Sequence, residues 1–202
     1  MTKLRIVLWT AVAVALFAVG ALSVGGLSFL DRERGAAALK PGAPLGGAFQ
    51  LVDASGKPVT ETIFREKPSI TLFGYTHCPD VCPTSLTEMA KWVEELGPDA
   101  EKLRFIFVTV DPERDTPDVM RDYLTAFSNH IVGISGPPDA VHAMVKDYKI
   151  YSRKVPIDGG DYSMDHTGSM ILQDAKGNFV GTIDTAESHE AGLAKLKHLV
   201  AG

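Results

Sequence analysis

The chain has 202 residues, an apolar content of 45% and a formal net charge of −5 at pH 7. This apolar content is that of a folded globular protein, which argues against extended disorder, and the length predicts one domain whose core needs no disulfide staples. The charge is mildly acidic and no basic run occurs, which argues against nucleic-acid binding.

An apolar segment, residues 6–30, follows Lys3 and Arg5 and contains no charged residue. Its length of about 25 residues is sufficient for a membrane-spanning helix, whereas the apolar core of a signal peptide is usually shorter. We therefore predict a cytoplasmic stub and an uncleaved single-pass anchor over residues 1–30; the alternative is a long cleaved signal. The positive charges that precede the segment predict a cytoplasmic amino terminus and an exported remainder.

A tether is predicted over residues 31–47, because GAAALKPGAPLGG, residues 35–47, is small, flexible and rich in turn formers. The folded domain is predicted over residues 48–202. An exported domain lies in an oxidising compartment, where a disulfide between cysteines can form.

The first half of the domain alternates strand and helix patterns. Residues 48–53 and 59–64 predict a short hairpin, and 69–75 predict a buried strand. From Pro83, apolar residues recur at the spacing of one helix face, and proline suits a first helical position. Residues 104–110 then predict a second buried strand.

The second half continues this alternation and ends with a hairpin and a helix. Thr116 before Pro117 predicts a capped helix start. The further predicted elements are a strand over 131–135, a helix from Pro138, a strand near 150–155, a loop over 156–163, a hairpin over 169–173 and 179–184, and a last helix with Leu193, Leu196 and Val200. This order predicts an α/β fold with a mixed central sheet flanked by helices.

Cys78 and Cys82, the only two cysteines, lie in CPDVC between the strand over 69–75 and the following helix. In an open sheet, ligands and chemistry collect where strands end and helices begin. We expect Cys82 to cap the helix, whose amino terminus stabilises a thiolate. One tight loop can bring both sulfur atoms together.

Three interpretations of this cysteine pair stay open. A structural disulfide across so short a loop would constrain the unfolded chain little. A thioredoxin-type redox pair would have two residues between its cysteines, and here there are three. Two soft thiolates suit copper or zinc, but structural zinc would need four protein ligands. Residue type alone favours a structural role for His166, which we expect in the loop that enters the strand over 169–173.

Three segments together indicate a family. FGYTHCPDVCPTSL, VTVDPERDTP and MDHTGSMILQDAKGNF resemble the Sco/SenC family of membrane-anchored copper-binding assembly factors. The resemblance extends from residue 48 to the carboxyl terminus, and CPDVCP followed far downstream by DHT is much more specific than a lone CxxxC. It implies a thioredoxin-like fold preceded by one transmembrane helix.

The resemblance also implies a metal site. Its ligands would be Cys78, Cys82 and His166, holding one copper ion per domain as Cu(I) or Cu(II). Asp111 matches an acidic position of the family motif near the copper, although a turn-capping role explains this residue equally well.

The expected function is copper delivery to the binuclear copper centre of cytochrome c oxidase subunit II. The expected location is the bacterial inner membrane, with the domain in the periplasm, and other periplasmic copper chaperones or thiol reductases are further expected partners. The expectation is a non-enzymatic metallochaperone. The alternative is a thiol–disulfide oxidoreductase that uses Cys78 and Cys82 to keep the subunit's cysteines reduced; a peroxidase fits less well because it would not need Cys82 and His166 together.

Overall fold

The computed structural model describes residues 39–201. The predicted anchor over residues 1–30 and residues 31–38 of the predicted tether lie outside this range. Within residues 39–201, no helix has the length and apolar character that a membrane crossing requires.

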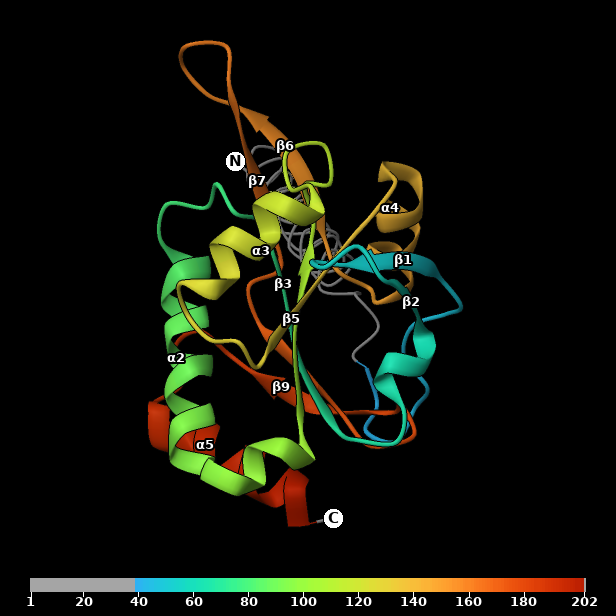
Figure 1. The fold of residues 1–202 in the computed structure, drawn as a ribbon, viewed down its shortest axis with the longest axis vertical. Helices are drawn as coiled ribbons and strands as arrows, with labels where there is room; N and C mark the ends of the chain where they lie inside the picture. The colour runs from blue at the N-terminus through green and yellow to red at the C-terminus, as the bar shows by residue number, and fades with distance from the viewer. Residues whose placement is uncertain (1–38, 202) are drawn as a thin grey trace, which may run out of the picture. The chain divides into compact units, whose positions relative to one another are not determined.

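A seven-stranded mixed sheet forms the centre of the fold, in the order β2-β1-β5-β4-β3-β8-β9 (Figure 1). Its strands are β1 (Gln50–Asp53), β2 (Pro58–Thr60), β3 (Ser69–Gly74), β4 (Arg104–Thr109), β5 (Ile131–Ser135), β8 (Met170–Gln173) and β9 (Phe179–Ile183). The three central strands β3, β4 and β5 are parallel, and every other pairing is antiparallel. β3 and β4 read as continuous apolar runs because helices cover both faces of a parallel sheet.

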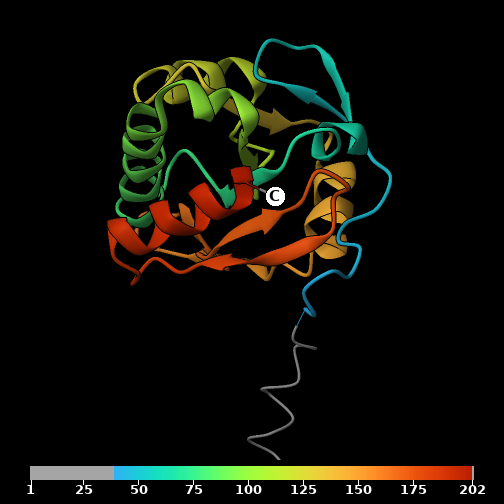
Figure 2. The ribbon, with the colours of Figure 1, turned by 90° about the horizontal axis from the view of Figure 1, so that it is seen from below.

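The helices divide between the two faces of this sheet. They are α2 (Val81–Leu96), α3 (Pro117–Thr125), α4 (Pro138–Asp147) and α5 (His189–Ala201), with short 3₁₀ helices at Glu61–Phe64 and Gly97–Lys102. Side chains of α2, α3 and α5 share one buried cluster with Leu72 and Phe107. Phe73 points to the opposite face and packs on Tyr148, at the end of α4, with ring centroids 5.4 Å apart. Figure 2 accordingly shows α4 well apart from α2 and α5.

This arrangement of a mixed sheet and flanking helices confirms the expected thioredoxin-like α/β fold. Local sequence signals explain much of it. Thr116 accepts a hydrogen bond from the backbone N–H of Val119, and Pro117 opens α3, both as predicted. β8 and β9 pair antiparallel, which confirms the hairpin predicted for these two segments.

Four predictions about local structure were wrong. The predicted strand over 59–64 ends at Thr60, where the 3₁₀ helix Glu61–Phe64 begins, and His166 lies at the end of a strand instead of in a loop. α2 begins at Val81, two residues before Pro83, and Asp80 is its N-cap in place of Cys82. The predicted loop over 156–163 extends only to residue 161, because β7 (Tyr162–His166) pairs antiparallel with β6 (Ser152–Pro156). These two strands form a separate two-stranded sheet, the β6–β7 hairpin, which projects from the main sheet at the top of Figure 1.

Candidate metal centre

The two cysteines lie where β3 ends and α2 begins. Gly74, the last residue of β3, leaves room for the sulfur of Cys82: a Cβ atom at position 74 would lie 2.7 Å from Cys82 Sγ and 2.9 Å from Phe107 Cε2. Cys82 is fully buried beneath the first turn of α2. The glycine in FGYTHC therefore permits a close approach between strand and sulfur.

Burial has an electrostatic consequence for Cys82. Removal from water raises the pKa of its thiol far above the usual range, and the neighbouring Cys78 raises it further. The expectation that the helix amino terminus would favour a Cys82 thiolate is therefore wrong, because desolvation outweighs the helix dipole at this depth. A cation bound to the sulfur would reverse that balance, because it replaces the lost hydration.

Cys78 occupies the helix end in a different way. Its sulfur accepts a hydrogen bond from the backbone N–H of Cys82 at 3.4 Å, so that Cys78 receives one of the free N–H groups of α2. Cys78 is partly exposed, whereas Cys82 is buried, and both are free thiols in the structure. The two cysteines of the pair therefore differ in their access to solvent.

His166 reaches the same place from the β6–β7 hairpin. It is the last residue of β7, and its Nε2 lies 3.8 Å from Cys82 Sγ. Its Nδ1 lies 3.0 Å from the carbonyl oxygen of Thr167, which can only accept, so Nδ1 carries the proton. In the neutral tautomer of the ring, Nε2 is then the nitrogen whose lone pair faces Cys82 and can accept a metal ion. The ring also packs edge-on against Tyr75, at 5.7 Å between centroids.

These distances allow a test of fit for a metal ion. Bonds of about 2.3 Å to sulfur and about 2.0 Å to nitrogen, at a trigonal angle, separate the two ligand atoms by about 3.7 Å. The observed separation of Cys82 Sγ from His166 Nε2 is 3.8 Å. Within residues 39–201, however, no three His, Cys, Asp or Glu side chains yet converge closely enough to hold an ion. Two of the three candidate ligands therefore have a spacing that fits one metal ion, and the partly exposed Cys78 would have to rotate toward them to complete the set.

Asp111 belongs to a polar network beside this site. Its buried carboxylate pairs with Arg114 Nε at 2.5 Å and accepts a hydrogen bond from Tyr162 at 2.8 Å. The neighbouring Asp115 is also buried and accepts hydrogen bonds from the side chains of Thr76 and Thr109. Burial raises the pKa of Asp115, and these hydrogen bonds oppose the rise. Asp111 therefore binds Arg114 and Tyr162 in addition to any role in the turn. In the sequence, the DPERDTP segment is the signal that points to this residue.

The remaining histidines lie away from the sulfur atoms or are engaged elsewhere. His77 is half exposed, with Nδ1 3.0 Å from the Thr76 hydroxyl. His189 bridges Glu88 and Glu95 at 2.7 and 2.8 Å, and so joins the start of α5 to α2. The other three, all exposed, are His130, His142 and His198. The structure thus singles out His166 among the six.

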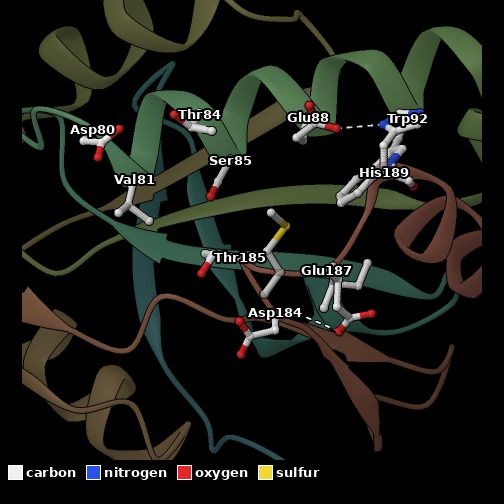
Figure 3. Close-up of a pocket in the computed structure, with 12 residues that line it drawn as sticks. Asp80, Val81, Thr84, Ser85, Glu88, Trp92, Asp184, Thr185, Glu187 and His189 are labelled. Carbon is white, nitrogen blue, oxygen red and sulfur yellow. Dashed lines mark hydrogen bonds and ion pairs between the residues drawn. The ribbon is translucent and has the colours of Figure 1, made fainter.

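A cleft of about 460 Å³ opens beside the cysteine loop (Figure 3). Residues of α2 line one side, and the end of β9 and the start of α5 line the other: Asp80, Val81, Thr84, Ser85, Glu88, Trp92, Met170, Ile183, Asp184, Thr185, Glu187 and His189. It includes the two residues before Cys82, but none of the three candidate ligands. The cleft therefore adjoins the start of α2 but does not contain the candidate ligands.

Gly74→Ala should disturb the site without touching a ligand. The new methyl group would press on Cys82 Sγ and the Phe107 ring, and overpacking of this kind costs about 1–3 kcal/mol of unfolding free energy. We expect the urea midpoint of unfolding to be lower and to rise less when copper is added. Gly181→Ala in β9, where nothing lies within 4 Å of the new Cβ, is the matched control and should be close to neutral. Equal effects of the two alanines would show that Gly74 does not set the position of the sulfur.

Comparison with known proteins places these features in context. The family model described as SCO1/SenC matches residues 37–201. The mitochondrial protein SCO2 of Saccharomyces cerevisiae is 39% identical over 160 residues, which cover 77% of this chain and 53% of that protein. The chain therefore spans about half the length of this curated relative.

Solved structures match the domain more completely. The structure of Bradyrhizobium japonicum ScoI with copper bound is 46% identical, with a TM-score of 0.72, and the match covers 77% of this chain and 99% of that one. Yeast Sco1 with copper bound is 34% identical, also with a TM-score of 0.72, over 79% of this chain and 90% of that one.

Proposed function

Since this chain belongs to the SCO1/SenC family, we propose that it is a copper metallochaperone that delivers copper to the binuclear copper centre of cytochrome c oxidase subunit II. The observation that carries the proposal is the 3.8 Å approach of His166 Nε2 to Cys82 Sγ, with Cys78 at the same helix end. A pair of thiols and a neutral imidazole is a donor set suited to copper.

The unequal burial of the two cysteines suggests how the cargo would leave. Cys78 is partly exposed and Cys82 is fully buried. A thiolate of the receiving protein can reach the copper from the solvent side, where it replaces Cys78 first. Cys82 and His166 hold the ion until a second ligand of the receiver arrives. An open site of three ligands can release its metal in this stepwise way, whereas a closed tetrahedral site would retain it.

A second function uses the same sulfur atoms without metal, and the free state of both thiols favours keeping it as the alternative. The Cys78 thiolate would attack a disulfide of the oxidase subunit and form a mixed disulfide, releasing one thiolate of the subunit. Cys82, once deprotonated, would then displace the second thiolate and close a Cys78–Cys82 disulfide. The subunit gains two electrons and this protein loses them, so an outside thiol reductase would have to restore the pair.

The setting of this chemistry is also part of the proposal. Residues 6–30 would anchor the chain in a bacterial inner membrane, with the amino terminus in the cytoplasm and the copper domain in the periplasm. Other periplasmic copper chaperones or thiol reductases are the partners that such a site would require upstream.

Deletion of the gene should separate the two functions. A copper donor acts by supplying metal, so we expect deletion to lower oxidase activity and copper in the medium to restore much of it. His166→Ala should behave like the deletion, because a dithiol reductant has no evident need for a distal imidazole. The measurement is oxidase activity in membranes from each strain, grown with and without added copper.

The matched control for this strain series is His142→Ala, which removes an exposed imidazole from α4. It should leave oxidase activity at the wild-type level. Normal activity with His166→Ala, together with rescue of the deletion by an added thiol reductant and not by copper, would replace the metallochaperone by the oxidoreductase.

A further inference from the structure

The β6–β7 hairpin that carries His166 has little support of its own. It shares no strand pairing with the seven-stranded sheet, and most of its residues are exposed or half exposed. Met164 is its one buried residue. Isolated two-stranded hairpins are marginally stable in water. Contacts with the body of the domain must therefore hold the hairpin in place.

Arg114 supplies a dense set of these contacts. Its Nη1 donates to the carbonyl oxygen of Tyr162 at 3.0 Å and to Asp161 Oδ1 at 3.1 Å. Its guanidinium carbon lies 3.8 Å from the centroid of the Tyr162 ring, within the range of a cation–π contact. One arginine therefore holds the backbone and the side chain at the start of β7.

Asp111, a buried residue of the main domain, holds both Arg114 and Tyr162. Arg114 Nε donates to Asp111 Oδ2 at 2.5 Å, and the Tyr162 hydroxyl donates to Asp111 Oδ1 at 2.8 Å. The Asp111 side chain is fully buried, and its backbone N–H donates to the hydroxyl of Thr109 at the end of β4. We call Asp111, Arg114 and Tyr162 the Arg114 clamp. It links the main sheet to the hairpin through charge-assisted hydrogen bonds, which are stronger than neutral ones.

A second link between hairpin and domain is weaker. Lys154 of β6 pairs with Glu113 at 2.5 Å, but both side chains are more than 40% exposed. Exposed ion pairs of this kind contribute little, because water and salt screen them. The Arg114 clamp, with one fully buried carboxylate, is the stronger of the two.

The geometry of β7 connects the clamp to the metal centre. Successive residues of a strand point to opposite faces, so Tyr162, Met164 and His166 share the face toward the domain. A slip of one residue in β7 would turn His166 to the other face. We propose that the Arg114 clamp sets the register of β7 and thereby positions His166 beside Cys82. This inference rests on the proposed copper site, and it makes Arg114 and Tyr162 positioning residues that touch no metal.

Two substitutions remove a small and a large part of the clamp. Tyr162→Phe keeps the ring and removes only the hydroxyl, so the fold should survive; Arg114→Met removes every contact of the guanidinium. In the metal-free protein, we expect hydrogen exchange of the β6–β7 amides to rise about tenfold or more. In the copper-loaded protein, we expect Cu(II) affinity to fall about tenfold, with a weaker thiolate-to-copper absorption band.

The controls remove the same chemical groups elsewhere. Tyr123→Phe deletes a buried hydroxyl that has no hydrogen-bond partner, and Arg121→Met deletes an arginine paired with Asp118 on the surface of α3. Both should keep wild-type hairpin exchange, and Arg121→Met should also keep the wild-type Cu(II) affinity.

The clamp is overturned if Tyr162→Phe and Arg114→Met match their controls in hairpin exchange, or if they loosen the hairpin while Cu(II) affinity and the absorption band stay unchanged. A wild-type protein that bound no copper would instead contradict the proposed function. Hydrogen exchange of the β6–β7 amides in the metal-free protein would then be the only test of whether the clamp sets the register of β7.

Discussion

Cys78→Ser and Cys82→Ser are each expected to abolish stable copper binding. Cu(I) prefers soft thiolate ligands, and a serine hydroxyl at neutral pH is a hard, uncharged donor. Loss of a direct ligand should cost more than the roughly 10–100-fold that follows from loss of an outer hydrogen-bond partner. The measurement is a competition titration against a chromogenic Cu(I) chelator, in which the wild type retains its metal and both variants lose it.

The two cysteine variants should also differ from each other. Cys82→Ser places a hydroxyl at a fully buried position, so it should lower the free energy of unfolding, whereas the partly exposed Cys78 tolerates serine. His77→Ala is the matched control, because this half-exposed neighbour of Cys78 faces the Thr76 hydroxyl. Retention of copper by either serine variant at the wild-type level would remove that cysteine from the ligand set.

The parts of the fold that the sequence predicts well are those with strong local signals. β3 and β4 are almost entirely buried and largely apolar because both of their faces are covered, and α3 carries its cap and first-turn proline in Thr116-Pro117. β7 escaped prediction because YSMDH is short, polar and half exposed. The pairing that makes it a strand comes from β6, so no pattern within the segment itself reveals it.

The candidate site, too, can be predicted from the sequence only in part. The sequence itself draws attention to Cys78 and Cys82, and the resemblance adds His166, but the contact between Cys82 and His166 spans 84 positions of sequence. Only the tertiary structure brings these two residues together. The burial that raises the pKa of Cys82 and the role of Gly74 likewise arise from packing against β4, which local sequence does not encode.

His166→Ala should separate the two oxidation states of copper. Cu(I) accepts two sulfur ligands in a linear arrangement, so weak Cu(I) binding by Cys78 and Cys82 should survive. Cu(II) prefers additional nitrogen or oxygen ligands, so its thiolate absorption should be lost. The imidazole is well prepared for this role in the wild type, because the Thr167 carbonyl holds the proton on Nδ1 and leaves Nε2 toward Cys82. Visible absorption after Cu(II) addition, beside a Cu(I) competition titration, measures both states.

The contrast between the two states is what identifies His166 as a ligand. A merely structural histidine would alter Cu(I) and Cu(II) binding together, through loss of the contact with Tyr75 and of hairpin packing. A ligand should affect Cu(II) far more than Cu(I), because only Cu(II) requires the nitrogen. His142→Ala, at an exposed position of α4, should leave both states at wild-type values. An unchanged Cu(II) spectrum for His166→Ala would mean that the 3.8 Å approach to Cys82 serves packing, and that the third ligand lies elsewhere.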